Sequence, residues 1–222
     1  MRLIIFDCDG TLVDSQNTIV GSMTAAFKDL GYEAPRPEKI RGLIGLSLEK
    51  TIRNLLPTPD LVKVDRLVAA YKKQFFENHV REEVPLDPLF PHADKVLRTL
   101  HSEGYQLGVA TGKSKRGLEV ILEGHKLRDI FVTLQTADEH PGKPHPSMLH
   151  QAMMETGMEA HDTLMLGDTS FDMTMAVNAG VHPVGVIWGY HSEDDLRAAG
   201  ANTILGDYHE LMPCVERLWP EV

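Results

Sequence analysis

The second half of the chain alternates short apolar runs with stretches of helical periodicity, and this alternation restricts the fold to an α/β class. A repeated order of strand, loop and helix is typical of a parallel sheet that carries helices on both faces. The sequence therefore predicts a doubly wound, Rossmann-like parallel sheet. The expected strands are residues 105–111, 130–134, 163–167 and 182–188, and the expected helices are one that ends at Gly124, then 146–156 and 171–179.

A further strand of the same sheet is expected near the N-terminus, at residues 3–6. Its four residues, LIIF, are all apolar, as expected for a strand that is buried on both faces. The chain from about Ser15 to Val84 has apolar side chains at helical spacing throughout, for example at Ile19, Met23 and Phe27. We therefore expect an α/β core formed by residues 1–14 and 85–222, with a small all-helical cap domain, residues 15–84, inserted after the first strand.

Composition limits the partners and the location of the protein. The 222 residues include 22 Lys and Arg against 32 Asp and Glu, a net charge of −10, and no basic run with interleaved aromatics, so we expect no nucleic-acid partner. The first apolar run stops at Asp7 and no other stretch approaches membrane-spanning length, so we expect neither export nor membrane insertion. Cys8 and Cys214 lack paired spacing and are expected to be free thiols in a reducing cytoplasm. The oligomeric state is not indicated.

Acidic, hydroxyl and amino side chains follow four of the predicted strands. Because the carboxyl ends of parallel strands meet at one edge of a sheet, these side chains are expected to converge there. They are Asp7 and Asp9 after the first strand, Thr111 at the end of the second, Lys143 in the loop after the third, and Asp168 and Asp172 after the fourth.

Several carboxylates in one place repel each other, and burial increases the cost, so a cation is expected among them. Oxygen ligands favour a hard cation such as Mg²⁺. A lysine and a hydroxyl beside that metal could neutralise the oxygens of a phosphoryl group, and one carboxylate could be the nucleophile. The sequence therefore predicts a magnesium site that binds a phosphoryl group.

The same segments resemble the four motifs of the haloacid dehalogenase superfamily. They are DxDGT from Asp7 to Thr11, the strand end at Thr111, Lys143 before a proline, and GDTSFD at 167–172, and their order covers nearly the whole chain. A helical insertion directly after the first motif, together with DGTLVDS, is similar to the subgroup that contains phosphoglycolate phosphatase and β-phosphoglucomutase.

The resemblance implies separate roles for the acids. Asp7 would attack phosphorus and form an aspartyl-phosphate, and Asp9 would protonate the leaving oxygen and later activate water. Asp7, the main-chain carbonyl of Asp9, and Asp168 would hold Mg²⁺. Asp172 would support either the waters of the metal or Lys143.

The resemblance also implies a set of phosphate-binding residues. Thr111 and Lys143 would hold the transferring phosphoryl group, and Gly10 would let backbone amides approach its oxygens. Gly112 stands where many relatives have Asn after the motif-two hydroxyl, so a side-chain amide is lost but a close backbone approach is possible.

Lys143 is not the only lysine that could supply the positive charge. Lys113 and Lys115 lie close to Thr111 in the sequence, and lysines before proline are common in exposed loops. We favour Lys143 for the contact with the phosphoryl group.

A loop of the predicted cap, RGLIGLS at residues 41–47, could reach over the site. Arg41 and Gly45 are therefore candidates for contact with the leaving group of the substrate. The alternative is that Arg41 is an ordinary solvated charge.

We expect a Mg²⁺-dependent phosphatase for a small phosphomonoester, with phosphoglycolate as the reference substrate by resemblance. A phosphomutase of the β-phosphoglucomutase type, or a pyrophosphatase or nucleotide phosphatase on the same core, remains the alternative. A carbon–halogen hydrolase is disfavoured because that chemistry needs no leaving-group proton and so no Asp9. A non-catalytic binding module is disfavoured because the catalytic set is complete.

Overall fold

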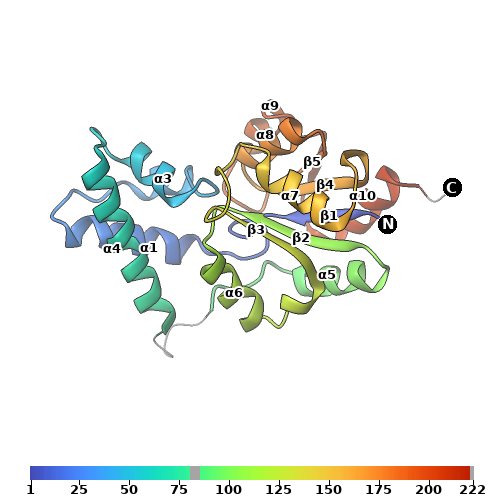
Figure 1. Ribbon diagram of the computed structural model, residues 1–222, viewed down its shortest axis with the longest axis horizontal. Helices are drawn as coiled ribbons and strands as arrows, with labels where there is room; N and C mark the ends of the chain where they lie inside the picture. Colours follow the sequence, from blue (N-terminus) through green and yellow to red (C-terminus); the bar gives the residue numbers. More distant parts are fainter. Residues whose placement is uncertain (81–85, 221–222) are drawn as a thin grey trace.

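The core of the molecule is a six-stranded parallel sheet in the order β3-β2-β1-β4-β5-β6 (Figure 1). The computed structural model describes residues 1–80 and 86–220, and side chains for 1–76 and 86–220. The direction of winding reverses between β1 and β4, which is where open α/β sheets form their binding crevice. The strands are β1 Leu3–Phe6, β2 Gln106–Thr111, β3 Phe131–Thr136, β4 Thr163–Gly167, β5 His182–Val186 and β6 Thr203–Leu205.

Helices cover both faces of this sheet, and β1 is buried between them. Ile4 and Phe6 belong to a core cluster with residues of α5, α6 and α10, whereas Leu3 and Ile5 pack with α7 and α8. The continuous apolar run therefore has the cause expected from the sequence, and the doubly wound class is confirmed. The helices are α5 Ala93–Ser102, α6 Lys115–Gly124, α7 Ser147–Thr156, α8 Ser170–Ala179, α9 Glu193–Ala198 and α10 Leu211–Leu218.

A separate helical group lies beside the edge of the sheet at which β1 ends (Figure 1). It consists of α1 Gln16–Asp29, α2 Pro37–Arg41, α3 Leu48–Leu55 and α4 Leu61–Val80, and these helices share a core that includes Ile19, Phe27 and Ile52. The helical character expected from residue 15 onward is observed in the described residues, where loops at 30–36, 42–47 and 56–60 separate the four helices. The loop expected at 41–47 is the second of these, except that Arg41 belongs to α2. Prolines at 35, 37, 57 and 59 account for two of these breaks. Residues 81–84, the end of the predicted cap, lie outside the described residues.

Smaller elements were harder to predict than the central strands. Residues 3–6 and 163–167 were predicted as observed, but the predicted strand 182–188 ends at Val186, and α5, α9, α10 and β6 were not anticipated. Cys8 and Cys214 are free thiols, as expected, and both are buried. None of the described helices is both long enough and apolar enough to cross a membrane.

Candidate active site

Four neighbouring strands bring the predicted site residues to one edge of the sheet. Asp7 follows β1 directly, and its N–H donates to the carbonyl of Leu166 in β4 at 2.9 Å. Thr111 is the last residue of β2, and Asp168 follows the last residue of β4. Because β1 pairs in parallel with both β2 and β4, Asp7 lies level with the ends of its two neighbours.

Lys143, in the loop after β3, lies between two of the acids. Its Nζ is 2.7 Å from Asp7 Oδ1 and 2.6 Å from Asp172 Oδ1, and all three side chains are buried. Burial disfavours the charged form of this lysine, but the attraction of Asp172 and Asp7 raises the pKa of Lys143 above its usual value. The structure therefore places Lys143, and not Lys113 or Lys115, beside the expected nucleophile.

Asp172 is oriented by the start of α8. Its Oδ2 accepts hydrogen bonds from the N–H and the hydroxyl of Thr169, at 3.0 and 2.6 Å, in a reciprocal capping box. Gly167 makes room for it, because a Cβ there would lie 2.4 Å from the Asp172 Cβ. The other oxygen is left for Lys143, which is one of the two roles expected for Asp172.

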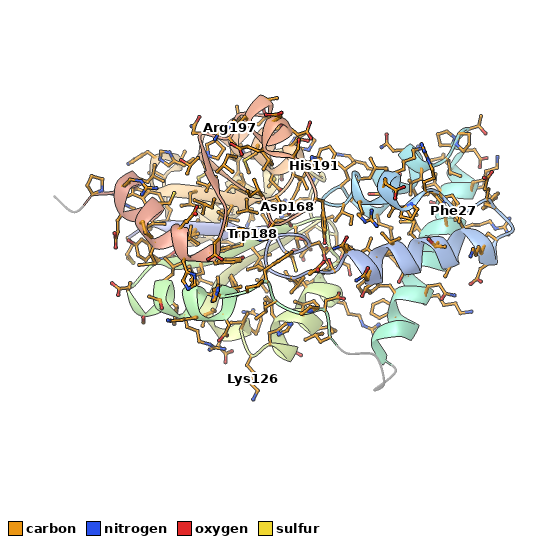
Figure 2. The ribbon with its side chains drawn as sticks, turned by 180° about the vertical axis from the view of Figure 1, so that it is seen from behind. Phe27, Lys126, Asp168, Trp188, His191 and Arg197 are labelled. Atoms are coloured by element: carbon orange, nitrogen blue, oxygen red, sulfur yellow. The ribbon has the colours of Figure 1, made fainter. Side chains whose placement is uncertain are left out.

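Asp168 is held by both of its oxygens. Oδ1 accepts a hydrogen bond from the Thr11 hydroxyl at 2.8 Å, and Oδ2 accepts one from the N–H of Tyr190 at 3.0 Å. Figure 2 shows Asp168 in the middle of the molecule with Trp188 and His191. The sequence assigned no contact to Thr11, so this hydrogen bond between two motifs was missed.

Gly10 has a structural role in addition to the expected one. Its N–H donates to the carbonyl of Val13 at 2.9 Å, so this amide is used within the tight turn after β1. Its φ is +84°, and a Cβ there would lie 2.2 Å from Asp168 Oδ2. The glycine is therefore needed for the close approach of Asp168.

The three acids Asp7, Asp168 and Asp172 fit a hard divalent cation. Each offers a carboxylate oxygen, and these atoms lie within 4.8 Å of one another at buried positions. Burial raises the pKa of Asp7 to about 7 against the opposing effect of Lys143, and burial with Asp172 and Asp7 nearby raises that of Asp168. Asp7 Oδ2 is buried and has no hydrogen-bond partner among the described residues. Three carboxylates beside the single charge of Lys143 leave an excess of negative charge that Mg²⁺ would balance.

Asp9 has different partners from Asp7. Its Oδ1 accepts a hydrogen bond from the Ser15 hydroxyl at 2.6 Å and lies 2.9 Å from Lys113 Nζ. The carboxylate is not part of the three-acid group, and the expected metal ligand was its main-chain carbonyl. Sequence reasoning missed both contacts, although Ser15 stands within the DGTLVDS motif and Lys113 had been considered for a different role.

Gly112 contacts the helical group. A Cβ at this position would lie 2.7 Å from the carbonyl oxygen of Leu46 and 2.8 Å from that of Gly45. A Cβ at Gly142 would similarly lie 3.0 Å from the Ser47 Cβ. The loop 42–47 therefore packs directly against the two core glycines. A larger residue after Thr111 would collide with this loop.

The two cap candidates fall in different places. Gly45 lines the cavity described below and, with φ +100°, packs close to Thr169 of the core. Arg41 is the last residue of α2; it lies 3.8 Å from Glu38 and is not among the residues that line that cavity. Arg41 was expected in the loop, but it ends the short helix α2, and its guanidinium faces Glu38 of the same helix.

A cavity of about 870 Å³ lies between the helical group and the core and opens onto Asp9. One wall is apolar and aromatic, and the other contains the loops that carry Gly112 and Gly142. Of the two acids of the first motif, Asp9 lines this space and Asp7 does not. Its apolar lining includes Ile19, Met23, Val68, Tyr71 and Phe75, and its cations are Lys50, Arg53, Lys72 and Lys113.

Comparison with known proteins agrees with this geometry. A model of a family described as haloacid dehalogenase-like hydrolase matches residues 4–186. The chain is 38% identical to "Probable phosphatase IndB" of Dickeya dadantii (strain 3937), over 97% of this chain and 94% of that protein. It is 29% identical to a phosphoglycolate phosphatase of Vibrio parahaemolyticus, covering 97% and 96%, and 29% identical to a pyrophosphatase PpaX of Bacillus mycoides, covering 98% of each. A haloacid dehalogenase-like hydrolase from Streptococcus pneumoniae has a similar structure, with a TM-score of 0.83, 27% identity and coverage of 96% and 98%.

Proposed function

Because the chain belongs to the haloacid dehalogenase-like hydrolase family and is a phosphatase, we propose that it hydrolyses a small phosphomonoester with Mg²⁺ through an aspartyl-phosphate. The observation that carries this proposal is the state of Asp7. One of its oxygens is held by Lys143, and the other is buried without a hydrogen-bond partner among the described residues. A carboxylate fixed in this way is suited to attack an electrophile that enters the site.

The reaction has two steps, both at phosphorus. An Asp7 oxygen forms a bond to phosphorus while the bond to the ester oxygen breaks, and Asp9 gives a proton to that leaving oxygen. A water molecule then attacks the aspartyl-phosphate, Asp9 takes its proton, and the Asp7–phosphorus bond breaks to release inorganic phosphate. Ser15 and Lys113 orient Asp9 for both proton transfers.

The remaining residues bind and orient the phosphoryl group. Asp7, Asp168 and Asp172, with the main-chain carbonyl of Asp9, would hold Mg²⁺ or its waters, and the bound cation would neutralise charge that develops on the phosphoryl oxygens. Lys143 and Thr111 bind the other phosphoryl oxygens.

The helical group, which we assign to a cap domain of residues 15–84, covers this chemistry. Its loop 42–47 sits on the core glycines, and Lys50 Nζ donates to the carbonyl oxygens of Gly142 and Lys143, at 2.8 and 3.3 Å. A cap in this position excludes bulk water from the aspartyl-phosphate and admits only the water that reacts.

The proposal is tested by phosphate release from phosphoglycolate, β-glucose 1-phosphate, pyrophosphate and nucleoside monophosphates, each with Mg²⁺ and with EDTA. We expect metal-dependent release that Asp7→Asn abolishes and that the exposed control Asp94→Asn leaves unchanged. Borohydride reduction during turnover, followed by mass spectrometry, should find homoserine at position 7. Activity that persists in Asp7→Asn would refute the covalent mechanism, and conversion of a sugar 1-phosphate to its 6-phosphate without release would assign the protein to the mutases.

A further inference from the structure

Lys113 is a buried cation at the boundary between the catalytic core and the helical group. It lies between β2 and α6, and its N–H donates to the Thr111 hydroxyl at 3.2 Å. Its side chain is only 5% exposed, and its Nζ lies 2.9 Å from Asp9 Oδ1. Burying a charged lysine costs free energy unless the charge is balanced, so this lysine does not serve merely to keep the surface soluble.

The other side of the Lys113 ammonium faces the helical group. Its Nζ lies over the ring of Phe75 in α4, 5.0 Å from the centroid, and Lys113 lines the cavity that opens onto Asp9. The ammonium has three N–H groups, and Asp9 provides one charged partner. Among the described residues Nζ has no other hydrogen-bond partner, so a donor that points away from Asp9 and from the Phe75 ring can face the cavity.

The other cations of the cavity have different positions. Lys50 Nζ donates to two main-chain carbonyls, and Arg53 is paired with Glu49 at 2.7 Å. Lys72 is exposed. Of these cavity cations, Lys113 is the one in contact with the expected general acid.

We propose that Lys113 determines substrate specificity by binding a second anionic group, a carboxylate or a phosphate, on the leaving part of the substrate. This inference rests on the proposed phosphatase function. Because Lys113 touches Asp9, and Asp9 touches the ester oxygen in the reaction, the second anion lies only a few bonds from the bond that breaks. The substrate class is therefore short phosphate esters or anhydrides with an adjacent anion. Lys113, instead of Arg41, is the residue that contacts the leaving group.

Three substrates of similar size and different charge test this role. Phosphoglycolate carries a carboxylate, ethyl phosphate has a neutral leaving group, and phosphoethanolamine carries an ammonium. The wild type should prefer them in that order by kcat/KM. Pyrophosphate, added as a fourth substrate, distinguishes recognition of a carboxylate from recognition of a phosphate.

The informative quantity is the ratio of kcat/KM for phosphoglycolate to that for ethyl phosphate. Loss of a charge-assisted contact should lower this ratio roughly 10- to 100-fold in Lys113→Met. Lys113→Arg keeps the charge and should retain most of the preference. Lys115→Met, two residues further on, removes an exposed lysine paired with Glu139 and should keep the wild-type ratio.

A binding measurement makes the inference independent of turnover. Calorimetric titration of phosphoglycolate and ethyl phosphate into Asp7→Asn, with and without Lys113→Met, should show the same loss of preference in Mg²⁺. If the wild type releases phosphate from no substrate, the proposed function fails while this titration still decides the role of Lys113. If Lys113→Met weakens all ligands equally and leaves the ratio unchanged, Lys113 only positions Asp9 and the inference is overturned.

Discussion

Removal of the buried ammonium of Lys143 should destabilise the metal-free protein severely. Its Nζ is 2.7 and 2.6 Å from two buried carboxylates, and a third, Asp168, offers an oxygen within 4.8 Å of theirs. In Lys143→Met these carboxylates lose their nearest positive charge but keep their burial. Removing one partner of a buried ion pair costs about 3–5 kcal/mol, because an uncompensated charge stays inside. A loss of that size is a large fraction of the roughly 5–15 kcal/mol by which domains are stable.

The assay is urea denaturation followed by circular dichroism, in EDTA and in excess Mg²⁺. Lys115→Met is the matched control, because its exposed ion pair at 3.2 Å should contribute only about 0–1 kcal/mol. Mg²⁺ should stabilise Lys143→Met more than it stabilises the wild type, since a dication among the three acids replaces part of the lost charge.

Two results would contradict this reasoning. If Lys143→Met and Lys115→Met unfold at the same urea concentration in EDTA, Lys143 does not balance the acidic cluster. If Mg²⁺ stabilises the wild type and Lys143→Met by equal amounts, the three acids do not form the metal site.

Three further predictions test other parts of the site. Asp9→Asn should slow formation and hydrolysis of the aspartyl-phosphate roughly 10²–10⁴-fold, measured by rapid quench, and a normal rate for either step would remove Asp9 from that step. Burial raises the pKa of Asp7 from its ordinary value of 3.8 to about 7, so the protonated carboxyl stabilises the fold fully below pH 4, and this stabilisation is lost as the pH rises through 7. In EDTA the melting temperature should therefore fall between pH 4 and pH 7, and it should fall less in Asp7→Asn. Gly112→Ala puts a Cβ within 2.8 Å of the carbonyl oxygens of Leu46 and Gly45, so it should displace the loop 42–47 and raise KM. Unchanged kinetics would show that the position of the loop does not depend on Gly112.

The strands that carry the site could be predicted because their composition is determined by burial on both faces. Residues 3–6 and 164–166 are continuously apolar, since each run packs against helices on both sides of the sheet. The three-residue strand β6 at the sheet edge is too short to give a distinctive pattern. The helix α5 was missed although its buried residues Ala93, Val96, Leu97 and Leu100 stand at helical spacing. Pro35, Pro37, Pro57 and Pro59 lie in or beside the loops at 30–36 and 56–60, and proline is the strongest sequence signal for such breaks.

The convergence of the site residues could also be predicted, since parallel strands necessarily end at one edge. The contacts between the core and the helical group could not. Two examples are the pairing of Lys113 with Asp9 beside Phe75 and the close packing of Gly112 against Leu46. Both depend on how the core and the helical group pack against each other. Arg41 was expected near the site because its sequence neighbours indicated a loop. In the structure, Pro37 begins a short helix that ends at Arg41.

The place of β1 in the sheet has a consequence for biosynthesis. β1 is an inner strand and leaves the ribosome before both of its neighbours in the sheet, residues 106–111 and 163–167. Its apolar residues Leu3–Phe6 therefore have both edges unpaired until most of the chain has been made, a condition that favours aggregation and recognition by chaperones. Lys143 and Asp172 are also synthesised late, so the buried cluster that they form with Asp7 can assemble only after residue 172 has been made.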